Sequence, residues 1–427
     1  MSAGARLRPV RMQRVALVAR DEDLGAVLDV VGAAGAVQLE PLPAGDAAPD
    51  ASPADIAAGA VRRDGCAALP GWCPQEDRAA LADRIAPLGG ALVPLPAPRG
   101  VDPPTQLAEA GPAHRAFAPL VRTYGVVPYD DVDPTVPAGI AYVLMFGMMF
   151  GDAGQGLLLL AAGLVLRLRP PRRLARWRGA WLFLAGAGLA STAFGALYGE
   201  YFGPTGLAPA LWLEPLAEPV RLLVAGIVLG GALLAVAYAV GVVNRWREGS
   251  AAFALYAPSG VAGAGLFAGF AALAAGWYFR STPLAAAGAI LAVAGLGLAG
   301  AGLRAAAGPG AAGAAQTVVQ LFDLVVRVCS NAVSFARLAA FGLTHAALGA
   351  VVWQGTTGLW HRGGGWPVAA VVLFAAGNAV TFGLEALVAG VQALRLEYYE
   401  LFSRVFETTG RPFRPWRIAP PEKGVPT

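Results

Sequence analysis

The chain has 427 residues, of which 56% are hydrophobic and only 14% are charged, and its mean hydropathy is +0.55. Several apolar stretches exceed the roughly 20 residues that a helix needs to cross a bilayer. The sequence therefore predicts an all-α polytopic membrane protein rather than a soluble one. The net charge is +4, but the basic residues cluster beside the apolar segments, as the positive-inside rule expects, so we expect no nucleic-acid partner.

Residues 1–134 hold most of the soluble sequence. QRVALVA (13–19) has the pattern of a strand, DEDLGAVLDVVGAAG (21–35) that of a helix ending at glycine, and AVQLEPL (36–42) that of a second strand. The apolar run VALVA is too short for the core of a secretory signal. We therefore expect a short cytoplasmic α+β arm.

Residues 42–115 are rich in Ala, Pro, Gly and Asp, and they contain one clear helical pattern, PQEDRAALADRIAPL (74–88). Such a composition is typical of turns and linkers. Much of this region is predicted to be a loose linker. We expect a membrane domain at 135–417 and a flexible tail at 418–427.

The membrane domain contains seven apolar segments, at about 136–168, 177–198, 218–244, 250–278, 283–304, 316–353 and 366–405. The connections RLRPPRRLARWR (167–178) and NRWREGS (244–250) and the tail RVFETTGRPFRPWR (404–417) are basic. The connection 199–219 is acidic and lacks Lys and Arg. Counting Lys and Arg places the three basic stretches, and with them the carboxyl terminus, in the cytoplasm, and the acidic connection outside.

The first apolar segment poses a topological problem, because with a cytoplasmic arm it must begin and end on the same side. The 33 residues of 136–168 would form about 50 Å of straight helix, more than one crossing of a ~30 Å core and less than two. Three glycines in GDAGQG (151–156) permit a bend. We therefore expect a hairpin of two short tilted helices, and eight membrane helices in all; one long helix with the arm outside is the alternative.

Polar residues recur along one face of the segment 316–353, where an ionisable group costs about 2.5 to 3.5 kcal/mol at the bilayer centre. A seven-residue repeat places the following residues on this face: Asp323, Ser330, Arg337 and Thr344, with Arg327, Asn331 and Ser334 nearby. The last segment repeats the arrangement with Asn378, Glu385 and Gln392, extended by Thr381, Arg395 and Tyr399. Two polar helix faces turned toward each other or toward a shared cleft indicate an ion path.

Structural explanations compete with this reading at several positions. Asp323 and Arg327 are spaced i, i+4, which favours a local salt bridge, and the hydroxyl of Thr344 can bond its own backbone. Glu385 and Arg395 lie about 15 Å apart along one helix and cannot pair directly. Arg337 has no acid three or four residues away, so a structural explanation is weakest there.

Other polar residues near the spans are ambiguous. Asp152 and Gln155 lie in the glycine bend, where they could cap helix ends or transfer protons. Tyr198, Glu200 and Tyr201 indicate an interfacial aromatic belt at the outer end of a span.

Sequence motifs for other chemistry are missing. The cysteines Cys66, Cys73 and Cys329 have no disulfide or metal-ligand spacing. The sequence contains no phosphate-cradling glycine motif and no nucleophile elbow. We therefore predict no catalytic residue, cofactor, metal site or nucleotide-binding site.

Five stretches in order resemble signatures of the membrane subunit of rotary V-type and A-type ATPases, called subunit a in eukaryotes and subunit I in bacteria and archaea. They are YGVVPYDDVDPT (124–135), MFGMMFGDAGQGLLLL (145–160), GALYGEYFG (195–203), SNAVSFARLAAFGLTHA (330–346) and EALVAGVQALRLEYYELFSRVFETTGRPFRPW (385–416). The resemblance covers roughly 120–416.

The resemblance implies a stator that lies against a rotating ring of small proteolipid subunits, each with one ion-binding carboxylate, and that provides two ion half-channels. Arg337 matches the family's essential arginine between them, and Arg395 matches its second arginine. Glu385 and His345 match polar positions that line the half-channels, and Ser334, Asn378, Gln392 and Asp152 are further channel-lining candidates. Such a subunit does not itself bind ATP. Its implied location is the plasma membrane, and its implied partners are the lipid bilayer, the ring, the socket subunit of the central stalk and the peripheral stalks.

Two departures from the family pattern stand out. The glycine bend commonly carries His or Tyr where this chain has Gln155, and family members usually have a far longer arm with extended charged helices. Only about 134 residues precede the membrane part here, without a long heptad pattern. The usual attachment to the stalks is therefore in doubt, whereas the half-channel reading is unaffected.

Two other functions remain open from the residues. A secondary transporter could use Arg337 and Arg395 to hold an anionic substrate near the midplane, although such folds generally show internal repeats and none is convincing here. A structural relative that assembles without conducting ions is the third possibility. The sequence does not indicate whether protons or sodium ions move, or whether ATP is made or consumed.

Overall fold

The computed structural model describes residues 9–40, 51–98, 101–107, 111–248, 251–406 and 410–418. The chain forms two compact units. The first, the arm, comprises Met1–Ala108, Gly125–Asp133 and Thr408–Thr427, and the second, the membrane unit, comprises Glu109–Tyr124 and Pro134–Glu407. This division differs from the boundaries expected from the sequence, because the segment after the last long helix belongs to the arm.

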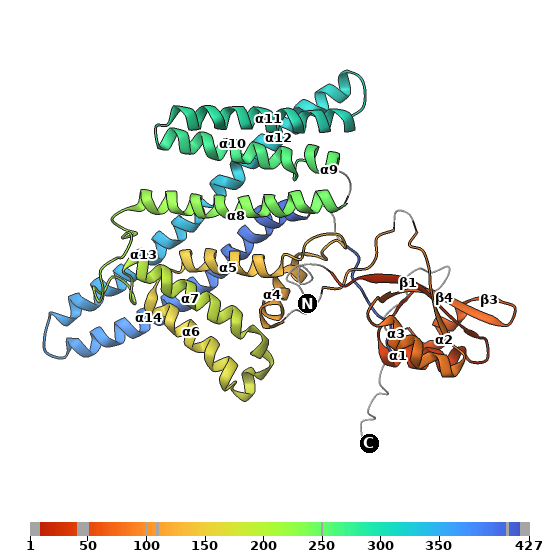
Figure 1. Cartoon of the computed structure of the whole chain (residues 1–427). Helices are drawn as coiled ribbons and strands as arrows, with labels where there is room; N and C mark the ends of the chain where they lie inside the picture. Colours follow the sequence, from red (N-terminus) through yellow and green to blue (C-terminus); the bar gives the residue numbers. More distant parts are fainter. Residues whose placement is uncertain are drawn as a thin grey trace. The chain divides into compact units, whose positions relative to one another are not determined.

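The arm is built on an antiparallel sheet (Figure 1) whose strand order is β2-β4-β1-β5. β3 pairs with the beginning of β4, whereas β2 pairs with a later part of the same strand. The strands and helices are β1 (Met12–Arg20), α1 (Leu24–Ala34), β2 (Gln38–Leu39), α2 (Pro53–Ala58), β3 (Val61–Arg63), β4 (Cys66–Pro74), α3 (Arg78–Ile85), a short 3₁₀ turn (Ala86–Leu88) and β5 (Ala91–Pro94). Without α2 and β3, this connectivity is the ferredoxin-like β-α-β-β-α-β motif. The predicted α+β arm is confirmed.

The prediction of a loose linker was wrong for residues 51–98, which supply two helices and three strands of the arm. β4 carries two prolines and a glycine in the sequence CAALPGWCP, and these residues weaken a strand signal. Pairing with β1 over nine residues, from Met12 opposite Pro74 to Arg20 opposite Cys66, overrides that local preference. Leu69 then lies in the core of the arm, and Trp72 is also buried.

The carboxyl-terminal segment 410–418 completes the arm. The Trp416 side chain is fully buried in the arm's core, its backbone N donates to Val37 O at 2.9 Å, and its Nε1 donates to Ala51 O at 2.8 Å. Arg411 pairs with Glu40 at 3.4 Å. Residues up to Ile418 are therefore part of a folded domain.

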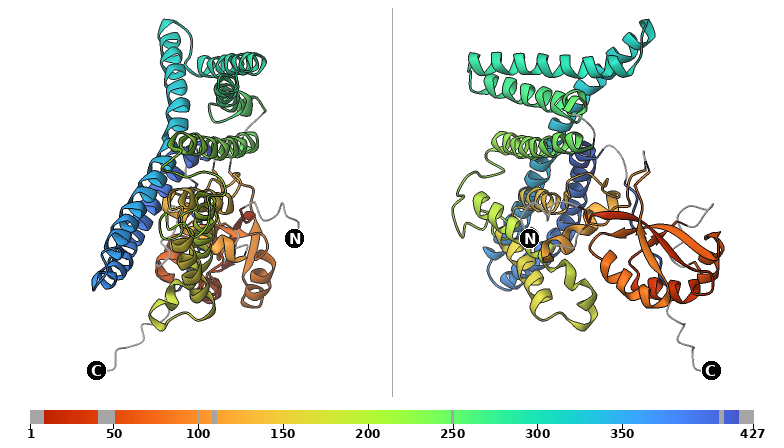
Figure 2. Two further views of the ribbon diagram at one scale, coloured as in Figure 1. Left: turned by 90° about the vertical axis from the view of Figure 1, so that its left-hand side faces the viewer. Right: turned by 45° about the vertical axis from the view of Figure 1, so that its right-hand side comes forward.

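The membrane unit is helical (Figures 1 and 2). Its helices are α4 (Gly111–Tyr124), α5 (Thr135–Met149), α6 (Ala153–Leu168), a 3₁₀ stretch (Arg172–Ala180), α7 (Trp181–Tyr198), α8 (Pro219–Glu248), α9 (Ala251–Tyr256), α10 (Val261–Tyr278), α11 (Thr282–Ala306), α12 (Ala311–Ser334), α13 (Ala336–Trp360), α14 (Trp366–Leu396), a π-helical turn (Glu397–Phe402) and α15 (Ser403–Val405). In the described chain, six stretches are long and apolar enough to cross a membrane, with α12 and α13 counted together. The total of eight spans stays a prediction.

The break in the first apolar segment lies where the glycines predicted it, between Met149 and Ala153. The two short helices differ from the expected hairpin in one respect, because α6 packs mainly against α7, which also contacts α5. α6 and α7 touch backbone to backbone through glycines: a Cβ on Gly156 would lie 2.5 Å from Thr192 N. Small residues permit such close approach between membrane helices.

The helices α12, α13 and α14 form the other main feature of this unit. α12 and α13 follow one long diagonal, and α14 returns antiparallel beside α13 (Figures 1 and 2). The segment expected at 316–353 runs from Ala311 to Trp360 and is interrupted at Phe335. The Phe335 side chain is fully buried and occupies the space that a side chain on Gly230 of α8 would need.

Candidate functional site

The centre of the α13–α14 hairpin holds a buried pair of ionisable side chains. His345 Nδ1 on α13 contacts Glu385 Oε2 on α14, and these residues are 6% and 8% exposed. The ring of Phe150 lies 5.0 Å from the His345 ring, between ring centres. The structure thus brings together two residues that the sequence analysis selected separately, at a place where unpaired charges would be costly.

Asp152 has a structural task at the amino terminus of α6. Its side chain is fully buried and accepts hydrogen bonds from the backbone N of Gln155 at 2.8 Å, Phe202 at 3.0 Å and Gly203 at 2.8 Å. A carboxylate at a helix amino terminus is favoured by the free N–H groups and the helix dipole. The residue caps the helix and fixes the turn after α7.

Polar contacts extend from this turn toward α14. Gln155 Nε2 donates to Asn378 Oδ1 at 3.3 Å. Glu200, in the turn after α7, is 5% exposed, and its backbone O accepts from Ala153 N at 2.8 Å. Burial and the charge of Asp152 raise the pKa of Glu200 from 4.5 to about 7, with His345 acting in the opposite direction.

Glu200 also lines a pocket of about 470 Å³ formed by the loop between α7 and α8, together with Glu214 and Tyr198. The expectation of an aromatic belt at this position missed the burial of Glu200, because the residue lies in a turn without helical periodicity. Its position directly after GALYG (195–199), in a loop without basic residues, was the available signal.

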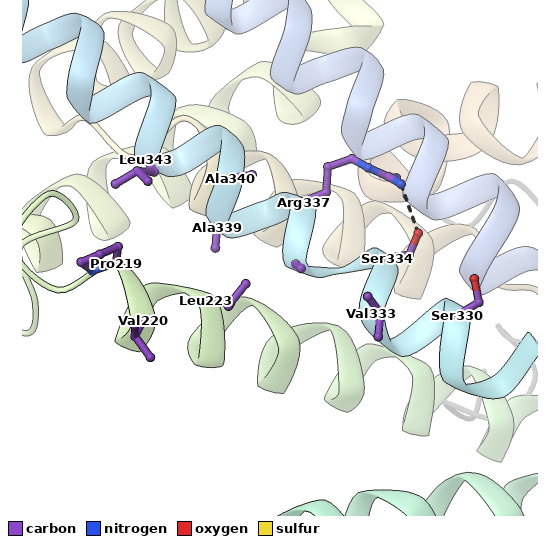
Figure 3. Close-up of a pocket in the computed structure, with 11 residues that line it drawn as sticks. Pro219, Val220, Leu223, Ser330, Val333, Ser334, Arg337, Ala339, Ala340 and Leu343 are labelled. Atoms are coloured by element: carbon purple, nitrogen blue, oxygen red, sulfur yellow. Dashed lines mark hydrogen bonds between the residues drawn. The ribbon is translucent and has the colours of Figure 1, made fainter. Parts of the chain in front are cut away.

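Arg337 lies in the first turn of α13, two residues after the interruption at Phe335. Its Nη2 donates to Ser334 Oγ at 3.3 Å. Arg337 also lines a pocket that includes Pro219 and Val220 (Figure 3). The Arg337 side chain is directed along the helix toward Ser334 and away from these two residues. This pocket of about 710 Å³ lies between α8 and the α12–α13 junction. Nη1 of Arg337 is buried and, in the part of the chain that the structure describes, has no hydrogen-bond partner.

Arg395 lies near the carboxyl end of α14, and its side chain is exposed. It comes ten residues after Glu385, whereas Arg337 comes eight residues before His345. Because the two helices are antiparallel, these offsets of about 15 and 12 Å place both arginines within one turn of the same level. Between Glu385 and Arg395 on α14, the side-chain oxygen of Gln392 is buried and lacks a hydrogen-bond partner among the described residues.

Two acids beyond Arg395 were missed by the sequence analysis. Glu397 and Glu400 lie in the π-helical turn after α14 and are 1% and 7% exposed. The hydroxyl of Ser334 donates to Glu400 Oε1. The heptad repeat did not mark these positions because a π-helical turn shifts the register of the following side chains.

Two polar positions on α12 and α13 have local partners. Arg327 contacts Asp323 on the same helix, and both side chains are largely exposed. Thr344 Oγ1 donates to Ala340 O, one turn earlier, at 2.9 Å. These are the local contacts that the sequence spacing favoured.

Comparisons with known proteins point to one family. Residues 61–198 match the V-type ATPase 116kDa subunit family. The chain is 29% identical over 375 residues to the A-type ATP synthase subunit I of Thermococcus kodakarensis, which covers 82% of this chain and 54% of that protein. It is 29% identical over 371 residues to the A-type ATP synthase subunit I of Aeropyrum pernix, covering 76% and 52%.

A third relative, the V-type proton ATPase subunit a of Neurospora crassa, is 33% identical over 103 residues, which are 22% of this chain and 12% of that protein. The chain spans about half the length of the two archaeal relatives. The family-model match spans part of the arm and the helices α4 to α7. These similarities are to the V-type ATPase 116 kDa subunit family, the family that the sequence motifs resemble.

Proposed function

We propose that this protein is the stator membrane subunit of a V/A-type rotary ATPase and forms two ion half-channels against a rotating proteolipid ring. The observation that carries the proposal is the α13–α14 hairpin, where Arg337 and Arg395 share one level and the buried pair of His345 and Glu385 lies about two to three turns away. The similarity to this family supports this function.

Arg337 would act as a fixed positive charge. A guanidinium stays protonated under all cellular conditions, and it favours the ionised form of a carboxylate that faces it. A protonated ring carboxylate that arrives there releases its proton before it passes.

The second task of Arg337 is to separate the half-channels. A permanent positive charge between two polar paths repels protons and sodium ions, so ions cross only when they travel on the ring. Ring rotation and ion transport are coupled in this way, and the chain carries out no covalent chemistry and binds no nucleotide. The ATPase activity belongs to other subunits of the complex.

One half-channel would run from the loop between α7 and α8 to the middle of the hairpin. Glu200 at the pocket, the contact of Gln155 with Asn378, and the pair of His345 and Glu385 provide successive polar groups along this route. Glu200 can both accept and release a proton near neutral pH, since its pKa is raised to about 7. The loop lacks Lys and Arg, which supports an opening on the outside, with the arm and carboxyl terminus in the cytoplasm.

The main test is Arg337→Ala in the assembled complex. ATP-driven acidification of membrane vesicles should be lost, because no fixed charge remains to discharge the ring carboxylate, and the amount of assembled complex should stay unchanged. Arg304→Ala, at the end of α11, is the matched control and should pump normally. Normal acidification by the Arg337 variant would refute the proposed function.

Purification from native membranes separates this function from secondary transport. Recovery of a small proteolipid ring, ATPase head subunits and the central-stalk socket subunit with this chain supports the stator. Co-purification of peripheral-stalk subunits would also show that the arm attaches to them. Recovery of the chain alone, with uptake of an anionic substrate into vesicles, favours a transporter.

A further inference from the structure

The side chain of Arg337 is connected to the π-helical turn after α14 through one hydroxyl. Arg337 Nη2 donates to Ser334 Oγ at 3.3 Å, and the Ser334 hydroxyl donates to Glu400 Oε1. The three residues come from three elements, α13, α12 and the π-helical turn. Their contacts therefore depend on both the interruption at Phe335 and the position of the turn.

Local backbone geometry produces this contact. Ser334 is the last residue of α12, and Phe335 separates it from α13. An extra residue per turn in a π-helix shifts the direction of its side chains, and such turns occur often at functional sites. Here the turn begins directly after α14 and brings Glu400, which is 7% exposed, to Ser334.

Packing alone does not explain why Glu397 and Glu400 are buried. Glu397 and Glu400 each have a buried Oε2 atom without a hydrogen-bond partner among the described residues. A buried carboxyl group with unused hydrogen-bonding capacity is costly. Apolar side chains of similar size would fill the same space at lower cost.

Arg404 lies four residues after Glu400, but its side chain contacts other residues. Arg404 lies with its guanidinium 5.5 Å from the centre of the Tyr238 ring. With the Asn331 amide turned so that both contacts form, its oxygen accepts from Arg404 Nη2 at 2.9 Å and its nitrogen donates to Arg327 O at 3.1 Å. Arg337, through Ser334, is therefore the cation to which Glu400 is connected.

We propose that Glu400 is a positioning residue for Arg337 and acts through Ser334. The carboxylate orients the serine hydroxyl as a donor, so that the serine oxygen accepts from Nη2 and holds the guanidinium plane. The guanidinium is then held in one orientation for the ring carboxylate. This inference rests on the proposed function, because positioning matters only if Arg337 faces a ring carboxylate.

The test compares Ser334→Ala, Glu400→Gln and the double variant in the intact complex, with the results normalised to the amount of assembled subunit. Two quantities are measured: ions transported per ATP hydrolysed, and passive proton conduction after removal of the ATPase head. Ser403→Ala is the matched control, because among the described residues its hydroxyl bonds only the backbone of its own helical turn, at Tyr399 O and Glu400 O.

Each single variant should lower transport per ATP by roughly tenfold, the range expected for one hydrogen bond to a charged group, and should raise passive conduction. The double variant should be no worse than Ser334→Ala alone, since both substitutions interrupt one connection. A structural role alone would reduce the assembled amount without changing either normalised quantity.

Unchanged transport per ATP in Ser334→Ala or in Glu400→Gln, or effects that add in the double variant, would overturn the positioning role. The Ser334 variant decides the question if the Glu400 variant fails to assemble. Arg337→Ala is measured in parallel: if it is inactive while the other variants are normal, only the positioning role fails. If Arg337→Ala itself transports normally, the proposed function fails.

Discussion

Two antiparallel helix pairs of the membrane unit are held together in different ways. The pair of α10 and α11 meets along small residues, and a Cβ on Gly288 would lie 2.6 Å from Leu273 N. The pair of α13 and α14 keeps His345, Glu385 and Thr381 buried between or beside its helices. Membrane helices associate well through small residues alone.

Burial of these polar groups destabilises the pair of α13 and α14. The pair of α10 and α11 shows that two helices of this unit can associate without them. Ionisable groups at membrane depth are expensive and are usually functional. We infer that α10 and α11 serve as scaffold, whereas α13 and α14 provide the ion path. Substitutions in the two pairs should separate protein abundance from transport.

The largest effect on transport among these comparisons is expected from Glu385→Gln. The amide keeps the size of the side chain and can still bond His345, but it cannot bind or release a proton. Transport should be almost abolished while the amount of the subunit in membranes stays unchanged. Vesicle acidification and immunoblotting measure the two quantities, and Glu22→Gln on the exposed surface of the arm is the control. Normal transport would remove Glu385 from the path.

The reciprocal change is Gly288→Val in the apolar pair. The added side chain collides with the backbone of α10, and overpacking of this kind costs about 1–3 kcal/mol or more. The amount of folded subunit in membranes should fall, whereas transport per assembled molecule should be normal. Gly297→Val on the same helix is the control, because nothing lies within 4 Å of its added Cβ. A loss of transport without a loss of protein would contradict the scaffold role.

The raised pKa of Glu200 predicts that the free energy of unfolding depends on pH. Its pKa is raised from 4.5 to about 7 by burial and by Asp152, so the folded state binds more protons than the unfolded state between these values. The free energy of unfolding should therefore fall as the pH rises from 4.5 to 7, by up to roughly 3 kcal/mol.

Thermal unfolding of the detergent-solubilised subunit across this pH interval measures the dependence. Glu200→Gln should remove it and should reduce transport, because an amide is not a proton carrier. Glu214→Gln, an exposed acid of the same pocket, should preserve transport and should weaken the pH dependence only slightly, because Glu214 is the smallest of the causes that shift the Glu200 pKa. An unchanged pH profile in the Glu200 variant would show that its carboxyl group does not titrate in this interval.

The smallest effect is expected from Thr344→Val. The Thr344 hydroxyl bonds Ala340 O within its own helix, and such contacts contribute little to a helix. Transport and abundance should both stay close to the unmodified values in the vesicle assay. A large loss of transport would mean that the exposed face of α13 carries ions as well.

Sequence periodicity predicted much of the membrane unit but less of the arm. The seven apolar segments, the break near GDAGQG and the separate polar residues Arg337 and Glu385 follow from composition and spacing, whereas the candidate His345 followed from the family resemblance. The strand β4 was missed because its prolines and glycine oppose strand formation locally, and only its pairing with β1 overcomes that preference. The interruption at Phe335 was missed because no proline or glycine marks it, and packing against Gly230 accompanies it.

The sequence by itself determined the class of protein, the apolar segments and the presence of expensive polar residues among them, because hydrophobic length and helical period are local properties. Tertiary structure alone decided which of these residues meet. His345 pairs with Glu385, Ser334 connects Arg337 to Glu400, and Trp416 enters the core of the arm. Each contact joins residues distant in the chain, so it depends on helix register, on turns that shift that register, and on close packing that no local pattern encodes.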